Sequence, residues 1–250
     1  MQGSVRLLLW VLLSTAALAP VRSSRAASSC PGDSNGDQVV SIDEVVSVVN
    51  AALGVCEASP SGGVLATGQT QCDAGDGILG TCPGSPLGQD GEVRAGAPLA
   101  YTDNGDGTIR DNATGLIWEK LSADASIHNF ARDYSWQDAF DVKIAALNTP
   151  PCFAGQCDWR LPNRRELDSL VHMGHSSPSI DPSFNTDCVS GCTVTTCSCT
   201  QSDNYWSSTS YQDPTLPGFA WCVSFSADAS VNGFEKSLPV FFVRAVRGGL

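Results

Sequence analysis

Oxygen-bearing residues near the N-terminus recur at the spacing of a calcium-binding loop. Counted from the first of them, they stand at loop positions 1, 3, 5, 7, 9 and 12, and they are Asp33, Asn35, Asp37, Val39 through its backbone carbonyl, Ser41 and Glu44. Calcium takes about six to eight hard oxygen ligands, so this spacing predicts a calcium site. Gln38 stands where such loops usually carry glycine, which favours weak binding. The alternative is a capped helix after an Asn-Gly turn, without metal.

A short helix is expected directly after this loop. Apolar residues recur there at helical spacing, namely Ile42, Val45, Val46, Val49 and Leu53. Ser41 and Glu44 form a capping box, and Gly54 is a natural stop. The loop and its exit helix resemble one half of a dockerin repeat, and the resemblance implies bound calcium. Dockerins that bind cohesins carry two such halves, whereas this chain shows one, so no cohesin partner is expected.

The chain contains 11 cysteines, and the closely spaced ones favour local disulfide bonds. The expected pairs are Cys30–Cys56, Cys72–Cys82 and Cys152–Cys157. The remaining cysteines are odd in number, so one thiol must be free or intermolecular, and their pairing stays open: Cys188, Cys192, Cys197, Cys199 and Cys222. The stretch 188–199 fits no common zinc motif. Because exported thiols oxidise, a disulfide-stapled loop is expected there rather than a zinc site.

Residues 1–27 have the organisation of a secretory signal peptide. Arg6 precedes the apolar run Leu7–Leu13, small residues follow, and cleavage is expected near Ala26 or Ala27. The apolar run is shorter than a transmembrane helix requires, and no later stretch of the sequence resembles a transmembrane helix. The expected location of the mature chain is therefore secreted, cell-surface or periplasmic.

The chain is strongly acidic, with 26 acidic and 14 basic residues and a net charge of −12. Removal of the signal peptide takes away Arg6, Arg22 and Arg25, which leaves 11 basic groups against 26 acidic ones and a net charge of −15. This balance argues against a nucleic-acid partner and against a basic surface that binds phosphate or sulfate groups.

The length of 250 residues suits one medium domain and a small appendage. We expect the calcium-loop module at residues 28–56, a flexible linker at 57–63 and the larger domain at 64–250. Within that domain, the Asn104-Gly105 and Asp106-Gly107 pairs are turn signals between two short strands, which predicts a β-hairpin. A second cation on three nearby carboxylates is the alternative use of these residues, namely Asp103, Asp106 and Asp111.

Two amphipathic helices are expected next. Ser135 begins the first, whose inner face is Ala139, Phe140, Ile144 and Leu147. Asn163 caps the second, whose inner face is Leu167, Leu170 and Val171. Strands are expected at 159–161, 221–225 and 240–247, with a long loop region at 174–204. This order of elements predicts an α+β domain with antiparallel strands.

Several motifs occur in a fixed order along the larger domain. They are DNGDGT at 103–108, TGLIW at 114–118, DWRLP at 158–162 followed by Glu166-Leu167, YWSST at 205–209 and VRAVRGG at 243–249. The series resembles the Legionella collagen-like protein C-terminal domain family, which is grouped with C-type-lectin-like folds. The resemblance implies a C-type-lectin-like domain and an extracellular, non-catalytic binding module. The family's best-known member is an adhesin for sulfated polysaccharide, a ligand that the charge of this chain does not favour.

A glycan or a protein is the expected ligand. Aromatic side chains near the long loops would stack on sugar faces, and the candidates are Tyr205, Trp206, Tyr211 and Trp221. The alternative is that the tryptophans fill the core.

Two other functions stay open. An enzyme similar to formylglycine-generating proteins would need a reactive cysteine on a late strand, where Cys222 lies, although a disulfide is expected for that residue. His172 and His175 would suit a metal, although such pairs at a helix end are usually solvated. A scaffold that uses the half-dockerin is the third function, and no second calcium repeat favours it.

Overall fold

The computed structural model describes residues 64–73, 75, 77–82, 88–237 and 241–248. The signal peptide, the calcium loop with its helix, and the Cys30–Cys56 pair lie outside the described residues. The predictions made for them therefore stay predictions.

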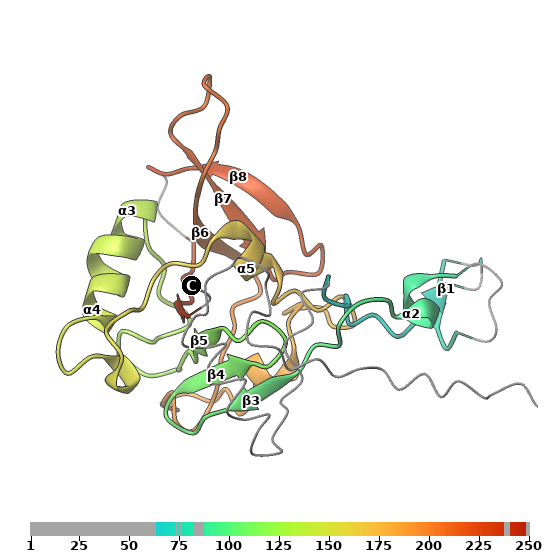
Figure 1. The fold of residues 1–250 in the computed structure, drawn as a ribbon, viewed down its shortest axis with the longest axis horizontal. Coiled ribbons are helices and arrows are strands. Elements are labelled where there is room, and N and C mark those ends of the chain that lie inside the picture. The colour runs from blue at the N-terminus through green and yellow to red at the C-terminus, as the bar shows by residue number, and fades with distance from the viewer. Residues whose placement is uncertain (1–63, 74, 76, 83–87, 238–240, 249–250) are drawn as a thin grey trace, which may run out of the picture. The chain divides into compact units, whose positions relative to one another are not determined.

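Three antiparallel sheets form the framework of the described chain (Figure 1). The first has two short strands, β1 (Cys72–Asp73) and β2 (Leu79–Gly80). The second has the strand order β3-β4-β5-β9, with bounds Tyr101–Asp103, Thr108–Asp111, Ile117–Glu119 and Val246–Arg247. The third has the order β6-β7-β8, with bounds Asn204–Ser210, Phe219–Ser224 and Val231–Glu235.

The helical segments are short. A continuous helical stretch is built from α3 (Trp136–Asp138), the π-helical η1 (Ala139–Ile144) and α4 (Ala145–Leu147). The others are α2 (Asp90–Val93), α5 (Arg164–Asp168) and the 3-10 turns η2 (Phe153–Gly155) and η3 (Pro182–Phe184). In the part of the chain that the structure describes, no helix is long and apolar enough to cross a membrane.

Both predicted helix starts are confirmed, and each has a side-chain cap. The Ser135 side chain accepts a hydrogen bond from the Asp138 amide at 3.1 Å. The Asn163 side chain accepts from the Arg165 and Glu166 amides, and the Glu166 carboxylate accepts from the Asn163 amide, which completes a capping box. The first helical stretch buries Ala139, Ile144 and Leu147 and half-buries Phe140, and α5 buries Leu167. Leu170 and Val171 are also buried, but they lie after the end of α5 at Asp168, so the predicted second helix is too long.

The predicted hairpin is confirmed between β3 and β4, where Tyr101 lies opposite Asp111. Its turn contains Gly105 and Gly107, whose φ angles are +77° and +95°. Such angles are accessible to glycine at little cost, which is why the Asn-Gly and Asp-Gly pairs mark the turn.

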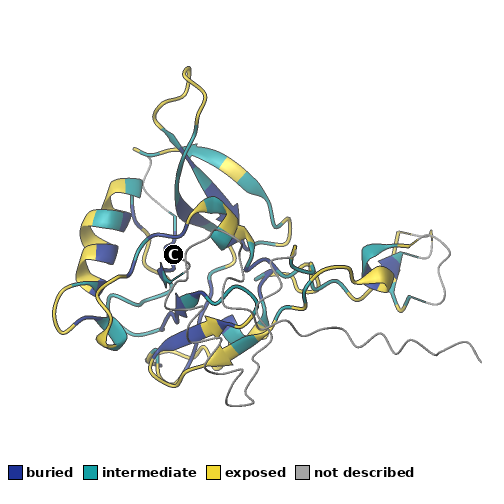
Figure 2. Ribbon diagram, viewed as in Figure 1, coloured by how far each residue is buried: buried dark blue, intermediate teal, exposed yellow. Residues whose placement is uncertain are grey.

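Buried residues lie along the strands of the second and third sheets (Figure 2). The two larger hydrophobic clusters of the described residues both include residues of β6. Tyr205 belongs to the cluster that contains Trp118, Leu167 and Phe184. The next residue, Trp206, belongs to the cluster that contains Trp159 and Cys222, among others. Because successive residues of a strand point to opposite faces, both faces of β6 are covered.

The strand predictions hold only in part. The expected strand 159–161 is reduced to a single bridge between Arg160 and Val246. Of the expected strand 240–247, only β9 is a strand, because the residues before it each pair with a different segment of the chain. Phe241 bridges to Tyr134 and Phe242 to Tyr205 before β9 pairs with β5. The domain is therefore a mixed α+β fold with antiparallel sheets and few helices, as expected at that level.

Candidate ligand-binding surface

Two of the aromatic candidates form a tilted pair of contacting rings at the third sheet. Tyr211 follows β6, Trp221 lies in β7, and their ring centroids are 4.5 Å apart with an interplanar angle of 35°. Both residues are half-buried, so part of each stays open to solvent. Gly233 in β8 makes this possible, since a Cβ there would lie 2.6 Å from the Tyr211 ring.

Arg164, the first residue of α5, covers the second ring of the pair. Its guanidinium carbon lies 4.8 Å from the centroid of a Trp221 ring, which is cation–π geometry. The Arg164 amide donates to the Thr209 hydroxyl at 3.0 Å, which fixes the start of α5 against the end of β6. The Arg164 Nε is buried and has no hydrogen-bond partner in the structure. We call Tyr211, Trp221 and Arg164 the aromatic surface.

A second cation–aromatic contact also involves β6. The Lys236 Nζ lies 4.2 Å from the Trp136 ring centroid and donates to the Ser210 hydroxyl at 2.9 Å. The Trp136 indole N–H donates to the Ser207 carbonyl at 2.9 Å. This contact provides a matched comparison for the aromatic surface.

The other two aromatic candidates are core residues, and their assignment to a ligand surface is wrong. Tyr205 and Trp206 are both 0% exposed. The Tyr205 hydroxyl accepts from the Gln201 amide at 2.8 Å, and the Trp206 indole N–H donates to the Tyr134 carbonyl at 2.9 Å. They are buried because both faces of β6 pack against hydrophobic clusters.

Four disulfide bonds occur within the described residues. Cys72 is bonded to Cys82 and Cys152 to Cys157, which are the pairs expected from the spacing. The pairs left open resolve as Cys188–Cys199 and Cys192–Cys197. Disulfides at this density are typical of a domain exported to an oxidising compartment.

The prediction of a disulfide at Cys222 is wrong, because this residue is a free, completely buried thiol. It lies on β7 in the hydrophobic cluster that contains Trp206. Burial raises the pKa of the Cys222 thiol well above its ordinary value. Such a thiol stays protonated and is a poor nucleophile.

The structure shows a buried charge cluster that the sequence patterns did not indicate. Glu119 and Lys143 are 0% and 1% exposed and form an ion pair. The same Glu119 oxygen contacts the His128 Nδ1 at 2.6 Å, and the other oxygen accepts from the Ala245 amide at 3.0 Å. Burial alone would raise the pKa of Glu119, but Lys143 and His128 outweigh it and hold the pKa at about 2.

This cluster joins distant parts of the chain and supports the core rather than a cleft. The completely buried Arg244 donates to the Glu119 carbonyl at 2.7 Å and to the Cys199 carbonyl at 2.8 Å. Every charged member is therefore anchored to backbone or to another charge. A lysine on the inner side of a helix was the one available signal, since Lys143 falls beside Ile144 on the buried face.

The carboxylates considered for a second cation are occupied by turn contacts. Asp103 pairs with Lys120 at 2.6 Å. Asp106 accepts from the Thr108 amide and hydroxyl, and Asp111 accepts from the Ala113 amide and the Thr114 hydroxyl. These contacts explain the residues through the hairpin and the turn after it.

His172 and His175 lie together, and His172 lines a pocket. Their ring centroids are 4.4 Å apart, and the His172 Nδ1 accepts from the Gly174 amide at 3.0 Å. A pocket of about 300 Å³ includes His172, Arg94 and Asp181 in its wall. Among the described residues, no third cysteine, histidine or carboxylate groups with the pair closely enough to complete a metal site.

Comparison with known proteins identifies the region that contains these features. Residues 107–247 match the model of the family described as the Lcl C-terminal domain. The match includes the aromatic surface, the buried charge cluster and three of the disulfide bonds, those at Cys152–Cys157, Cys188–Cys199 and Cys192–Cys197. No curated protein matches the chain.

Proposed function

The chain belongs to the Lcl C-terminal domain family, and we propose that it is a secreted or cell-surface binding module that recognises a glycan or a protein ligand without catalysis. The observation that carries the proposal is the aromatic surface. Half-buried rings that are already in contact lose little conformational freedom on binding, and their faces suit the apolar faces of sugars or a side chain of a protein ligand.

Arg164 adds a polar component to this surface. Its planar guanidinium lies over Trp221, and its Nε has no partner in the structure. The buried Nε is out of a ligand's reach, so the other guanidinium N–H groups would donate to a ligand hydroxyl or carbonyl beside the rings. Rigid aromatic rings beside one well-placed donor are a common arrangement in binding sites.

The burial of Cys222 supports the non-catalytic part of the proposal. A formylglycine-generating type of reaction needs an accessible cysteine of lowered pKa with a partner cysteine. Cys222 is buried, its pKa is raised by that burial, and no disulfide joins it to another described cysteine.

A glycan array probed with the mature protein tests this function. We expect binding that survives a chelator and that falls at least tenfold in Tyr211→Ala and Arg164→Ala variants. Trp136→Ala is the matched control, because it removes a half-buried aromatic ring under a lysine but lies outside the aromatic surface. Equal losses in all three variants, or no ligand on a glycan array and in a pull-down of extracellular proteins, would contradict the proposal.

We further propose that the N-terminal module binds one calcium ion through Asp33, Asn35, Asp37, Val39, Ser41 and Glu44. The support is the ligand spacing in the sequence. Calorimetric titration of the mature protein should give a dissociation constant of about 0.1–1 mM, the range of extracellular calcium modules. Glu44→Gln should abolish the heat signal, whereas Asp103→Asn should leave it unchanged. Loss of binding in the second variant only would move the ion to the hairpin.

The proposed location and partners rest on the sequence. Cleavage of the signal peptide near Ala26 or Ala27 would release a mature chain of charge −15, which disfavours nucleic acid. A single dockerin-like half does not favour a cohesin partner. N-terminal sequencing of the protein recovered from its host should therefore begin near Ala27 or Ser28, and a retained Met1 would contradict export.

A further inference from the structure

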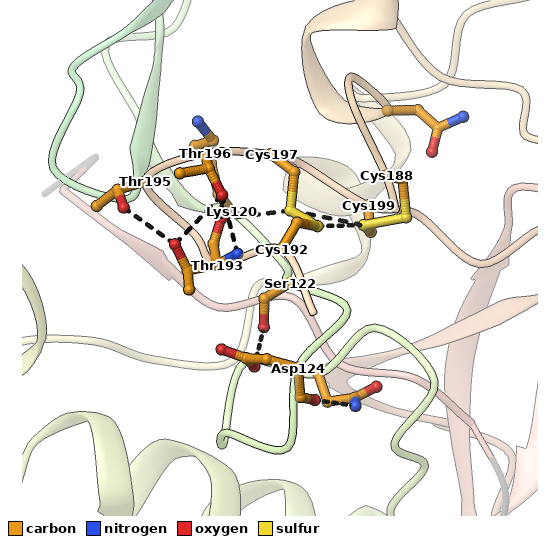
Figure 3. The surroundings of a disulfide bond; sticks show 12 residues. Lys120, Ser122, Asp124, Cys188, Cys192, Thr193, Thr195, Thr196, Cys197 and Cys199 are labelled. Atoms are coloured by element: carbon orange, nitrogen blue, oxygen red, sulfur yellow. Dashed lines mark hydrogen bonds between the residues drawn. A yellow bond between two sulfur atoms is a disulfide. The ribbon is translucent and has the colours of Figure 1, made fainter. Parts of the chain in front are cut away.

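Four cysteine sulfurs meet in the loop between η3 and β6 (Figure 3). The Cys188–Cys199 and Cys192–Cys197 bonds are adjacent rather than separate. The Cys199 sulfur lies 3.9 Å from the Cys192 sulfur and 3.9 Å from the Cys197 sulfur. These are contact distances between non-bonded sulfurs, so one disulfide lies within reach of an attack by a sulfur of the other.

The four sulfur-bearing residues differ sharply in their exposure. Cys188 is exposed, whereas Cys192, Cys197 and Cys199 are 8%, 2% and 0% exposed. A thiol in solution therefore meets the cluster at Cys188. The Cys192–Cys197 bond is shielded from direct attack.

We propose that Cys188 is a site of covalent thiol attachment and that Cys199 passes the exchange on to the buried Cys192–Cys197 bond. In the first step, an external thiolate attacks the Cys188 sulfur. A mixed disulfide forms there, the Cys188–Cys199 bond breaks, and its electron pair leaves on the Cys199 sulfur as a thiolate.

In the second step, the Cys199 thiolate attacks Cys192 or Cys197. A new disulfide to Cys199 forms, the Cys192–Cys197 bond breaks, and its electron pair leaves on the other sulfur. Two disulfide bonds are present before and after these steps, so a small thiol alone is sufficient and no oxidant is consumed.

The surroundings of Cys199 favour this relay. The completely buried Arg244 guanidinium donates to the Cys199 carbonyl at 2.8 Å, which fixes the backbone that carries the relay sulfur. The Cys199 amide donates to the Leu121 carbonyl at 2.8 Å, and the Cys197 amide donates to the Thr193 carbonyl at 2.9 Å. These backbone contacts hold the sulfurs in place after the first bond opens.

The Cys152–Cys157 bond provides an internal comparison. Cys157 is exposed and Cys152 is 8% exposed, so this bond also joins an outer and an inner sulfur. Among the described residues, the grouped sulfurs are those of Cys192, Cys197 and Cys199, and Cys152 is not among them. A thiolate released on Cys152 therefore has no second disulfide to attack.

The test uses the folded, oxidised mature protein and glutathione as the thiol. After incubation, free thiols are alkylated under acid quench, and the linkages are mapped by tandem mass spectrometry. We expect glutathione on Cys188, a new bond from Cys199 to Cys192 or Cys197, and an alkyl group on the sulfur that was displaced. Cys222 reports unfolding, because this core thiol is alkylated only when the domain opens.

Two variants sharpen the result. In the Cys192→Ser/Cys197→Ser variant, glutathione should still attach to Cys188, and the alkyl group should move to Cys199. The Cys152→Ser/Cys157→Ser variant should react at the cluster as the wild type does. If either variant fails to fold, the wild-type map decides the proposal. An intact Cys192–Cys197 bond beside an alkylated Cys199 would overturn the relay, and the absence of glutathione from Cys188 would overturn the attachment site.

Discussion

At the scale of single residues, the buried Glu119 carboxylate has three partners in the described domain. It balances the buried Lys143, contacts His128 and accepts from the Ala245 amide. Glu119→Gln would leave an unpaired ammonium in the core, and breaking a buried pair in this way costs about 3–5 kcal/mol. Urea denaturation should show this loss. Glu119→Gln combined with Lys143→Met should recover part of it, and a double variant less stable than the single one would contradict the pairing.

The same carboxylate predicts a dependence of stability on acid. Its pKa is about 2 in the folded chain against an ordinary value of 4.5, so the folded state favours the ionised form. A lowered carboxyl pKa stabilises the fold fully above about pH 4.5, and this contribution of about 3 kcal/mol is lost as the pH falls toward 2. Other acidic groups also titrate there, so the readout is the difference between wild type and Glu119→Gln. That difference should shrink from pH 5 to pH 2, and a constant difference would contradict it.

At the scale of elements, Gly233 in β8 is the position that sets the aromatic surface. A Cβ there would lie 2.6 Å from the Tyr211 ring, so Gly233→Ala should push this ring off Trp221. We expect at least a fivefold loss of glycan binding and a change in the near-ultraviolet circular dichroism of the tryptophans. Gly218→Ala is the matched control, because a Cβ there meets nothing within 4 Å. Equal losses of glycan binding in both variants would show that Tyr211 is not part of the binding site.

The sequence correctly predicted those helix starts and turns that are stabilised by contacts between residues close together in the chain. Ser135 and Asn163 cap helices through contacts two or three residues away, and the turn at 104–107 depends on its own glycines. The segment 241–247 behaved differently because its partners come from four distant places. It contacts Tyr134, β6, Arg160 and β5 in turn, so its alternating apolar pattern reflects burial on all sides rather than one long ladder.

At the scale of the whole molecule, the candidate site was visible in the sequence only as a residue type. Tyr205, Trp206, Tyr211 and Trp221 are equally aromatic, but two cover the core and two form the pair of contacting rings. The distinction depends on what covers each face of β6 and β7. The odd number of cysteines likewise predicted that one thiol is unpaired. That this thiol is Cys222 follows from the pairing of Cys188, Cys192, Cys197 and Cys199 with one another in one loop.

We expect the charge of the mature chain to limit the class of ligand that the proposed binding module accepts. At the net charge of −15 expected after removal of the signal peptide, the molecule should repel polyanions, and the proposed recognition through aromatic rings would not depend on counterion release. We therefore expect no retention on immobilised heparin at about 50 mM salt, and nearly constant affinity for an array-identified neutral glycan between about 50 and 200 mM salt. Arg164→Ala should lower the affinity for the glycan without changing the absence of retention on heparin. If the wild type is retained on heparin and Arg164→Ala abolishes this retention, the aromatic surface binds anions despite the negative net charge of the chain.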